Sequence, residues 1–91
     1  MIEFRISKHA KEQMEEREIT EDMVKDIIKN PDQEFPQGDE KHIYQSIKEF
    51  KTDKKSYLVR VFVNIVKIPW LVITVYKTSR IKKYWKNEDK I

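Results

Sequence analysis

The sequence predicts an α+β fold in which two N-terminal helices pack on one face of a three- to five-stranded antiparallel sheet, followed by a basic C-terminal tail. Apolar residues recur at helical spacing between residues 7 and 30, and apolar runs with strand-like alternation occupy residues 41 to 78. The connections between these runs are short, so consecutive strands must be antiparallel, because a parallel return needs a long crossover. A chain of 91 residues has room for one core, and we expect one domain over residues 1–91.

The N-terminal third begins with a short strand over residues 2–6, where Ile and Phe alternate with charged residues. Ser7 and Thr20 are each expected to be an N-cap, because a hydroxyl can accept a hydrogen bond from the first free backbone N–H groups of a helix. The first helix is expected to run to about Arg17. The second is expected to end at Asn30-Pro31, because proline excludes the residue before it from helical geometry.

Three strands are expected over about 41–50, 55–66 and 69–78, joined by short loops. The segment 33–40 contains a proline and the single glycine, which predicts a loop or a short edge strand. The tail over 79–86 is too polar for a core strand and is expected to be a helical turn or an extended segment.

Strand alternation assigns the side chains to two faces. Val59, Val61 and Val63 predict the face that the helices cover. The other face is then expected to collect cations and aromatic rings: His42, Tyr44, Lys48, Arg60, Phe62, Trp70, Thr74 and Tyr76. Such a face suits unpaired RNA, because bases stack on rings and cations hold phosphates. A partner interface with the rings as anchors, or an ordinary solvated face, explains the same pattern.

The charge is divided along the chain. Residues 1–40 carry 6 Lys/Arg against 12 Asp/Glu, a net of −6, whereas residues 41–91 carry 13 against 4, a net of +9. A basic sheet and tail favour a polyanion such as RNA. The alternatives are that the acidic helices neutralise the sheet on which they pack, that like chains stack head to tail, or that the tail binds an acidic protein.

Several function classes have no support in the sequence. There is no cysteine, which excludes a disulfide framework and thiol chemistry and fits a cytoplasmic location. One glycine is too few for a phosphate-binding loop or a dinucleotide fingerprint. The two histidines lack a third ligand at metal-binding spacing, and no signal peptide or membrane span is apparent. No cofactor is therefore expected.

His9 is the candidate for proton transfer. It shares a helical stripe with Gln13 and Arg17, which we expect to line the helix edge where it meets the sheet. A histidine there can exchange a proton near neutral pH, with an arginine beside it to hold a phosphate. The alternative is that His9 pads the first turn of the helix.

The stretch from Ile6 to Thr20, which opens Ser7-Lys8-His9-Ala10, with the later Asn30-Pro31-Asp32 and the close over residues 75–85, resembles a prokaryotic domain-of-unknown-function family of the DUF 4258 type. That family is similar in outline to RelE-like and BrnT-like toxins, which cut RNA without a metal. The chain departs from the family pattern at two positions: an arginine is expected where Gln13 stands, and a glycine helix C-cap where Glu18 stands.

The resemblance implies a small metal-independent RNase, the toxin of a toxin–antitoxin pair, inhibited by an acidic antitoxin. His9 would transfer a proton, Arg17 and Arg60 would stabilise the phosphate, and Tyr76 or Tyr44 would orient it or donate a proton. The residues that would hold RNA are Tyr44, Lys77, Ser79, Arg80, Lys82, Lys83 and Tyr84. This enzyme requires His9 and Arg60 to meet in one cleft.

Two other hypotheses stay open. The chain is either a non-catalytic module that binds nucleic acid or protein, or a homodimer in which Trp70 and Tyr76 anchor the interface.

Overall fold

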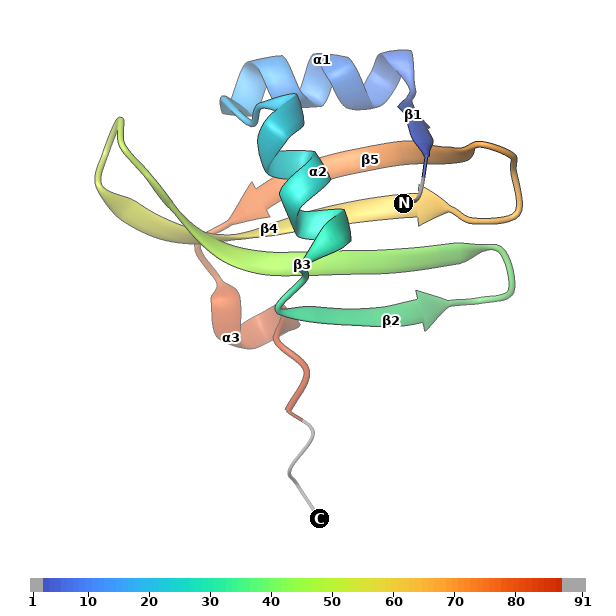
Figure 1. Cartoon of the computed structure of the whole chain (residues 1–91). Helices are drawn as coiled ribbons and strands as arrows, with labels where there is room; N and C mark the ends of the chain where they lie inside the picture. Colours follow the sequence, from blue (N-terminus) through green and yellow to red (C-terminus); the bar gives the residue numbers. More distant parts are fainter. Residues whose placement is uncertain (1–2, 88–91) are drawn as a thin grey trace.

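The computed structural model of the chain describes residues 3–87 (Figure 1). The α+β class is confirmed, but one of the three described helices follows the sheet, so the helices are not all N-terminal. No helix in this range is long and apolar enough to cross a membrane. The elements are, in order, β1 (Phe4–Ile6), α1 (Lys8–Arg17), α2 (Glu21–Lys29), β2 (Gln33–Gln37), β3 (Lys41–Phe50), β4 (Lys55–Asn64), β5 (Trp70–Thr78) and α3 (Ile81–Tyr84).

The five strands form one mixed sheet in the order β1-β5-β4-β3-β2. The pairs from β5 to β2 are antiparallel, whereas β1 runs parallel to β5, so the prediction of a wholly antiparallel sheet was wrong for this pair. No short hairpin joins β1 to β5, so their relative direction is not fixed by a turn. The expected edge strand is β2, where Pro36 is tolerated because an edge strand leaves one side of its backbone unpaired.

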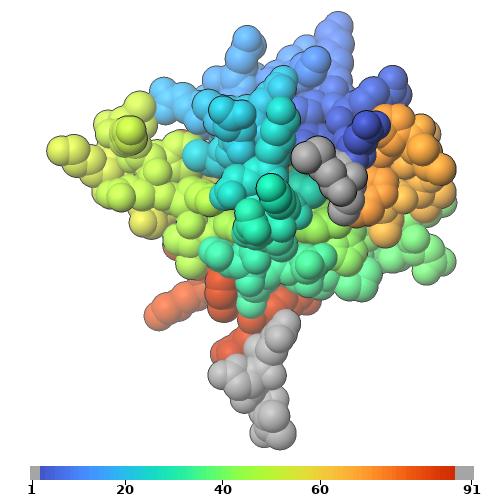
Figure 2. Space-filling model, in the orientation of Figure 1, coloured from blue at the N-terminus to red at the C-terminus, as the bar shows by residue number. Residues whose placement is uncertain are grey.

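Both predicted helix caps are present. The Ala10 amide donates to Ser7 Oγ at 3.1 Å, and the Met23 amide donates to Thr20 Oγ1 at 3.1 Å. Figure 1 shows α2 crossing in front of the sheet and α1 above β5, and Figure 2 shows α2 (teal) in front of the sheet centre. The buried residues of the two helices join the β4 valines in one core: Ala10, Met14, Val24, Ile27 and Ile28. Ile2, which the sequence places in the first strand, lies outside the described residues.

The two departures from the family pattern both have structural roles. Glu18 is the C-cap of α1 with a left-handed φ of 60°, the conformation for which glycine was expected. Its carboxylate accepts a hydrogen bond from Thr52 Oγ1 at 3.1 Å, which ties the end of α1 to the β3–β4 hairpin. Gln13 Oε1 accepts from the Val75 amide at 2.9 Å, so this side chain caps part of the outer edge of β5.

A β-bulge changes which β5 residues face the helices. Phe62 lies opposite Thr74 but Val63 lies opposite Val72, so Ile73 is an extra residue on β5. One inserted residue reverses the alternation beyond it. Trp70 therefore packs against the helix-side core, and its predicted place on the uncovered face was wrong.

The face assignment of β3 was also wrong. Residues directly opposite each other in an antiparallel pair share a face, and Gln45 lies opposite Arg60 whereas Tyr44 lies opposite Val61. His42, Tyr44 and Lys48 therefore lie on the helix-covered face. Burial raises the pKa of Tyr44 to about 12, and the charge of Glu34 adds to this shift.

The face opposite α1 and α2, called here the distal face, carries the Arg60 side of the sheet. Of the predicted set, Arg60, Phe62, Thr74 and Tyr76 lie on it, with Gln45 and Ile47 from β3.

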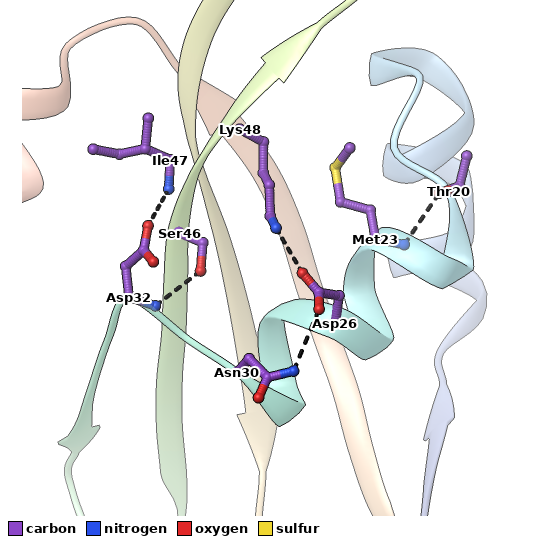
Figure 3. Close-up of polar contacts among 8 residues, drawn as sticks. All are labelled: Thr20, Met23, Asp26, Asn30, Asp32, Ser46, Ile47 and Lys48. Atoms are coloured by element: carbon purple, nitrogen blue, oxygen red, sulfur yellow. Dashed lines mark hydrogen bonds and ion pairs between the residues drawn. The ribbon is translucent and has the colours of Figure 1, made fainter.

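Polar contacts fix α2 and the connection after it against β3 (Figure 3). Lys48 Nζ donates to Asp26 Oδ2 at 2.6 Å. The Asp32 amide donates to Ser46 Oγ at 2.9 Å, and Asp32 Oδ2 accepts from the Ile47 amide at 2.9 Å. These bonds set where β2 starts beside β3.

The Asp26 contact predicts a pH-dependent stability. The pKa of Asp26 lies below its ordinary value of 3.8, mainly because Lys48 donates a hydrogen bond to the carboxylate. A carboxyl group with a lowered pKa stabilises the fold above its unfolded pKa, and this stabilisation is lost as pH falls through the folded pKa. We expect Asp26→Asn to lower the free energy of unfolding at neutral pH and to have little effect below the folded pKa.

Urea denaturation over a range of pH measures this difference. Asp39→Asn, in the exposed β2–β3 turn, is the control and should change little. An effect of Asp26→Asn that is independent of pH would contradict the prediction.

Candidate nucleic-acid interface

Arg60 lies in the middle of β4 and is 8% exposed. Its Nε donates to Gln45 Oε1 at 2.8 Å, and its Nη1 donates to Tyr76 Oη at 2.8 Å. The strand register brings the three together, because Arg60 lies directly opposite Gln45 on β3 and Tyr76 on β5. The central strand thus holds its guanidinium between two neutral polar partners.

Three aromatic rings surround this guanidinium. Its Cζ lies 4.6 Å from the ring centroid of Tyr84, 5.3 Å from that of Phe62 and 5.8 Å from that of Tyr76. Phe62 and Tyr76 are stacked, with centroids 6.0 Å apart, and Tyr84 meets Tyr76 edge-on at 6.4 Å. Ring faces attract a cation, so the cage partly offsets the cost of removing the charge from water.

No carboxylate of the described residues pairs with Arg60. The third nitrogen, Nη2, has no hydrogen-bond partner in residues 3–87. Every fully buried side-chain nitrogen or oxygen of that range has a partner, so Nη2 is not among the fully buried atoms. Nη2 therefore reaches solvent. The cage thus presents one free edge of an uncompensated cation to the outside.

Side-chain amides connect Arg60 to the C-terminal segment, defined as residues 79–87. Gln45 is fully buried, and its Nε2 donates to Gln33 Oε1 at 2.8 Å and to the Tyr84 carbonyl at 3.2 Å. Gln33 in turn binds both backbone groups of Lys86: its Oε1 accepts from the amide at 2.9 Å and its Nε2 donates to the carbonyl at 2.6 Å. These amides dock the segment on the distal face and hold Tyr84 over Arg60.

The predicted RNA-holding cations of the C-terminal segment are on the surface. Arg80, Lys82 and Lys83 are exposed, as is Ser79. Lys77 lies elsewhere: it is on the helix-covered face, with Nζ 3.9 Å from the Phe50 ring centroid. Tyr44, also predicted to bind RNA, lies in the core at 6% exposed and is not on the surface.

The predicted meeting of His9 and Arg60 in one cleft was wrong. His9 and Arg17 are on α1, which packs on the opposite face of the sheet from Arg60. His9 is exposed, and Arg17 Nη1 pairs with Glu16 at 3.5 Å. The buried residues of α1 share a core with Val61 and Val75, which face away from the Arg60 side of the sheet.

Sequence reasoning singled out Arg60, Tyr76 and Tyr84 but missed Gln33 and Gln45. A usable pattern was present: Gln45 is an uncharged polar residue between Ile43 and Ile47 on one face of a strand. A polar residue among apolar neighbours on a covered face needs hydrogen-bond partners. The partners themselves come from residues far along the chain and leave no local pattern.

Two hollows of this surface differ in size and lining. One, of about 420 Å³, lies beside the Arg60 cage between β3 and the C-terminal segment and is lined by Ile47, Ile81, Lys82, Trp85 and Asn87. The other, of about 910 Å³, lies between β1 and α2, where cations and carboxylates alternate around Phe4 and Ile28. The smaller one shares the distal face with the free edge of Arg60.

The hydrogen bonds of Gln45 predict that this side chain stabilises the fold. We expect Gln45→Ala to lower the free energy of unfolding by about 1–3 kcal/mol, because it leaves Arg60 Nε and the Tyr84 carbonyl without partners. Urea denaturation measures it. Gln37→Ala, an exposed glutamine on β2, is the matched control. Equal effects of the two substitutions would show that the network contributes no stability.

The comparisons with known proteins bear on the family and not on the activity. No curated protein and no solved structure matches the chain. The likeness to RelE-like and BrnT-like toxins therefore stays a prediction. One family matches residues 6–77, which include α1, α2, the Arg60 strand and Tyr76. The chain belongs to the family described as Domain of unknown function (DUF4258).

Proposed function

We propose that the chain is a single-stranded RNA-binding module that contacts RNA with the distal face, from Arg60 to the cations of the C-terminal segment. One observation carries the proposal. Arg60 is 8% exposed, has aromatic rings around it, turns Nη2 to solvent and has no carboxylate partner in residues 3–87.

A charge in this position favours an external anion. Removing an unpaired charge from water is costly, and most buried charges are paired. Gln45 and Tyr76 supply neutral acceptors to Arg60, which leaves its positive charge uncompensated. A phosphate oxygen at Nη2 would compensate that charge with a charge-assisted hydrogen bond.

The surroundings fit the same ligand. Arg80, Lys82 and Lys83 are exposed and make no ion pair with the carboxylates of the described range. Cations beside aromatic rings are the combination that single-stranded nucleic acids use, because phosphates need charge and unpaired bases need a surface for stacking. Duplex RNA offers its phosphates but keeps its bases stacked.

The same cations suit an acidic protein. An antitoxin-like partner, if the chain acts as a toxin, would cover Arg80, Lys82 and Lys83 and compete with RNA for them. The acidic partner and the homodimer both stay predictions. An acidic partner that displaces RNA would bind these cations through its carboxylates. Its binding to the chain would weaken at high salt, because salt screens exposed charges.

RNA binding is tested with fluorescence anisotropy of a labelled single-stranded oligomer over a range of salt concentrations. We expect the Lys82→Glu/Lys83→Glu double variant to bind at least tenfold more weakly than the unsubstituted chain. The slope of the logarithm of the binding constant against the logarithm of salt concentration should decrease in magnitude by roughly 1.4. Two phosphate contacts are lost, and each contact to a single strand contributes about 0.7.

The control is Lys25→Glu/Lys29→Glu, which makes the same change in net charge on α2 across the sheet. It should retain most of the affinity. Equal weakening by both double variants, or binding that ignores salt, would contradict the proposed surface.

RNA cleavage is a second candidate function, favoured by the 2.8 Å bond from Arg60 Nη1 to Tyr76 Oη. The Tyr76 hydroxyl accepts from the guanidinium and keeps its own proton to donate. In such a reaction the ribose 2′-oxygen attacks phosphorus and its proton passes to water. The bond to the 5′-oxygen breaks, the tyrosine protonates that oxygen, and Arg60 stabilises the phosphate.

If the chain cleaves RNA, the structure favours Tyr76 and not His9 as the residue that transfers a proton. We expect Tyr76→Phe to abolish cleavage in EDTA while binding persists, and His9→Ala to leave cleavage unchanged because α1 is across the sheet. Denaturing gels of end-labelled RNA measure both. Intact RNA with the unsubstituted chain at high concentration would remove this function and leave binding alone.

A further inference from the structure

The 420 Å³ hollow beside the Arg60 cage is lined by residues of β3 and of the C-terminal segment. Ile47 on one side is 40% exposed, and Ile81 with the indole of Trp85 forms the other. Lys82 and Asn87 also line it. The hollow is thus a largely apolar slot whose lining includes one aromatic residue and one cation.

The aromatic wall is held in place before any ligand arrives. The Trp85 amide donates to the Ile81 carbonyl at 2.9 Å, which fixes the residue at the end of α3. The residues on either side are also held: Gln45 binds the Tyr84 carbonyl, and Gln33 binds both backbone groups of Lys86. The backbone that carries the indole is therefore held on both sides by side-chain amides.

Residues 79–87, which supply most of the lining of the slot, carry only positive charges. Lys82 lines the slot, Lys83 and Arg80 are close along the chain, and in the described part of the chain these three cations make no ion pair. A ligand that complements the slot carries a flat apolar group next to a negative one. A nucleotide has this pair of groups, and pockets for small ligands measure roughly 300–1,000 Å³.

We propose that the slot between Ile47 and Trp85 takes one unpaired base of the RNA, stacked on the indole, while Lys82 binds an adjoining phosphate. This inference rests on the proposed RNA binding and adds to it a specific base pocket. It requires a single strand, because a base inside a duplex stack cannot enter. Lys82 then belongs to the pocket, and Arg60 binds a different phosphate.

Trp85 fluorescence tests the pocket in the full chain. The chain has two tryptophans, and Trp70→Phe keeps an aromatic ring against Tyr44 while leaving Trp85 as the one indole. We expect a single-stranded uridine oligomer to quench Trp85 with saturation. The same oligomer with abasic sites should bind about tenfold more weakly and quench little, since stacking on an aromatic residue is lost.

Substitutions in the pocket provide the second measurement. We expect Trp85→Leu and Ile47→Thr each to weaken binding of the uridine oligomer about tenfold and to leave the affinity for the abasic oligomer unchanged. Ile68→Ala, an exposed apolar residue in the β4–β5 loop, is the control and should have no effect. Ile47→Thr keeps a β-branched residue on the strand, so the test does not depend on Trp85→Leu folding.

The two proposals fail differently. If no oligomer binds with salt dependence, RNA binding itself is wrong. If the uridine and abasic oligomers bind equally and Trp85 is not quenched, the base pocket is wrong and RNA binding stands. Quenching by an acidic, leucine-containing peptide but not by RNA would also overturn the pocket and assign the slot to a protein partner.

Discussion

The distal face depends on one buried guanidinium. Arg60 is enclosed in the middle of the sheet, and it needs neutral acceptors and ring faces in place of the water it has lost. Gln45, Tyr76 and Tyr84 supply these, and each comes from a different part of the chain: β3, β5 and α3. Solvation of one charge therefore fixes the position of the C-terminal segment, and with it the rings, the slot and the exposed lysines.

Local features were predicted well because local physics determines them. The caps at Ser7 and Thr20, the bounds of β3 and the end of α2 each follow from a few neighbouring residues. The face assignments failed where the determinant was non-local. Alternation cannot reveal the extra residue at Ile73. The middle of β3, residues 43–46, is buried on both faces, so alternation there does not distinguish a solvent-facing side.

The same distinction explains the site. Arg60 and Tyr76 were identified because a cation and rings alternate on adjacent strands. His9 was assigned to the wrong side because helical spacing gives the face of a helix but not which side of the sheet that helix covers. The return of the C-terminal segment over the sheet could not be predicted, since the contacts that hold it join Gln33 to Lys86, 53 residues apart.

The outer boundaries of the sheet restrict how partners can approach. At one end of the sheet, β1 pairs with the start of β5, and Gln13 accepts a hydrogen bond from the Val75 amide. At the other end, Pro36 has no backbone N–H and so interrupts the row of donors on β2. Within residues 3–87, neither boundary offers a long run of free backbone groups for strand addition. The chain is thereby protected against edge-to-edge aggregation, and β-augmentation, a common route for peptide capture, is disfavoured.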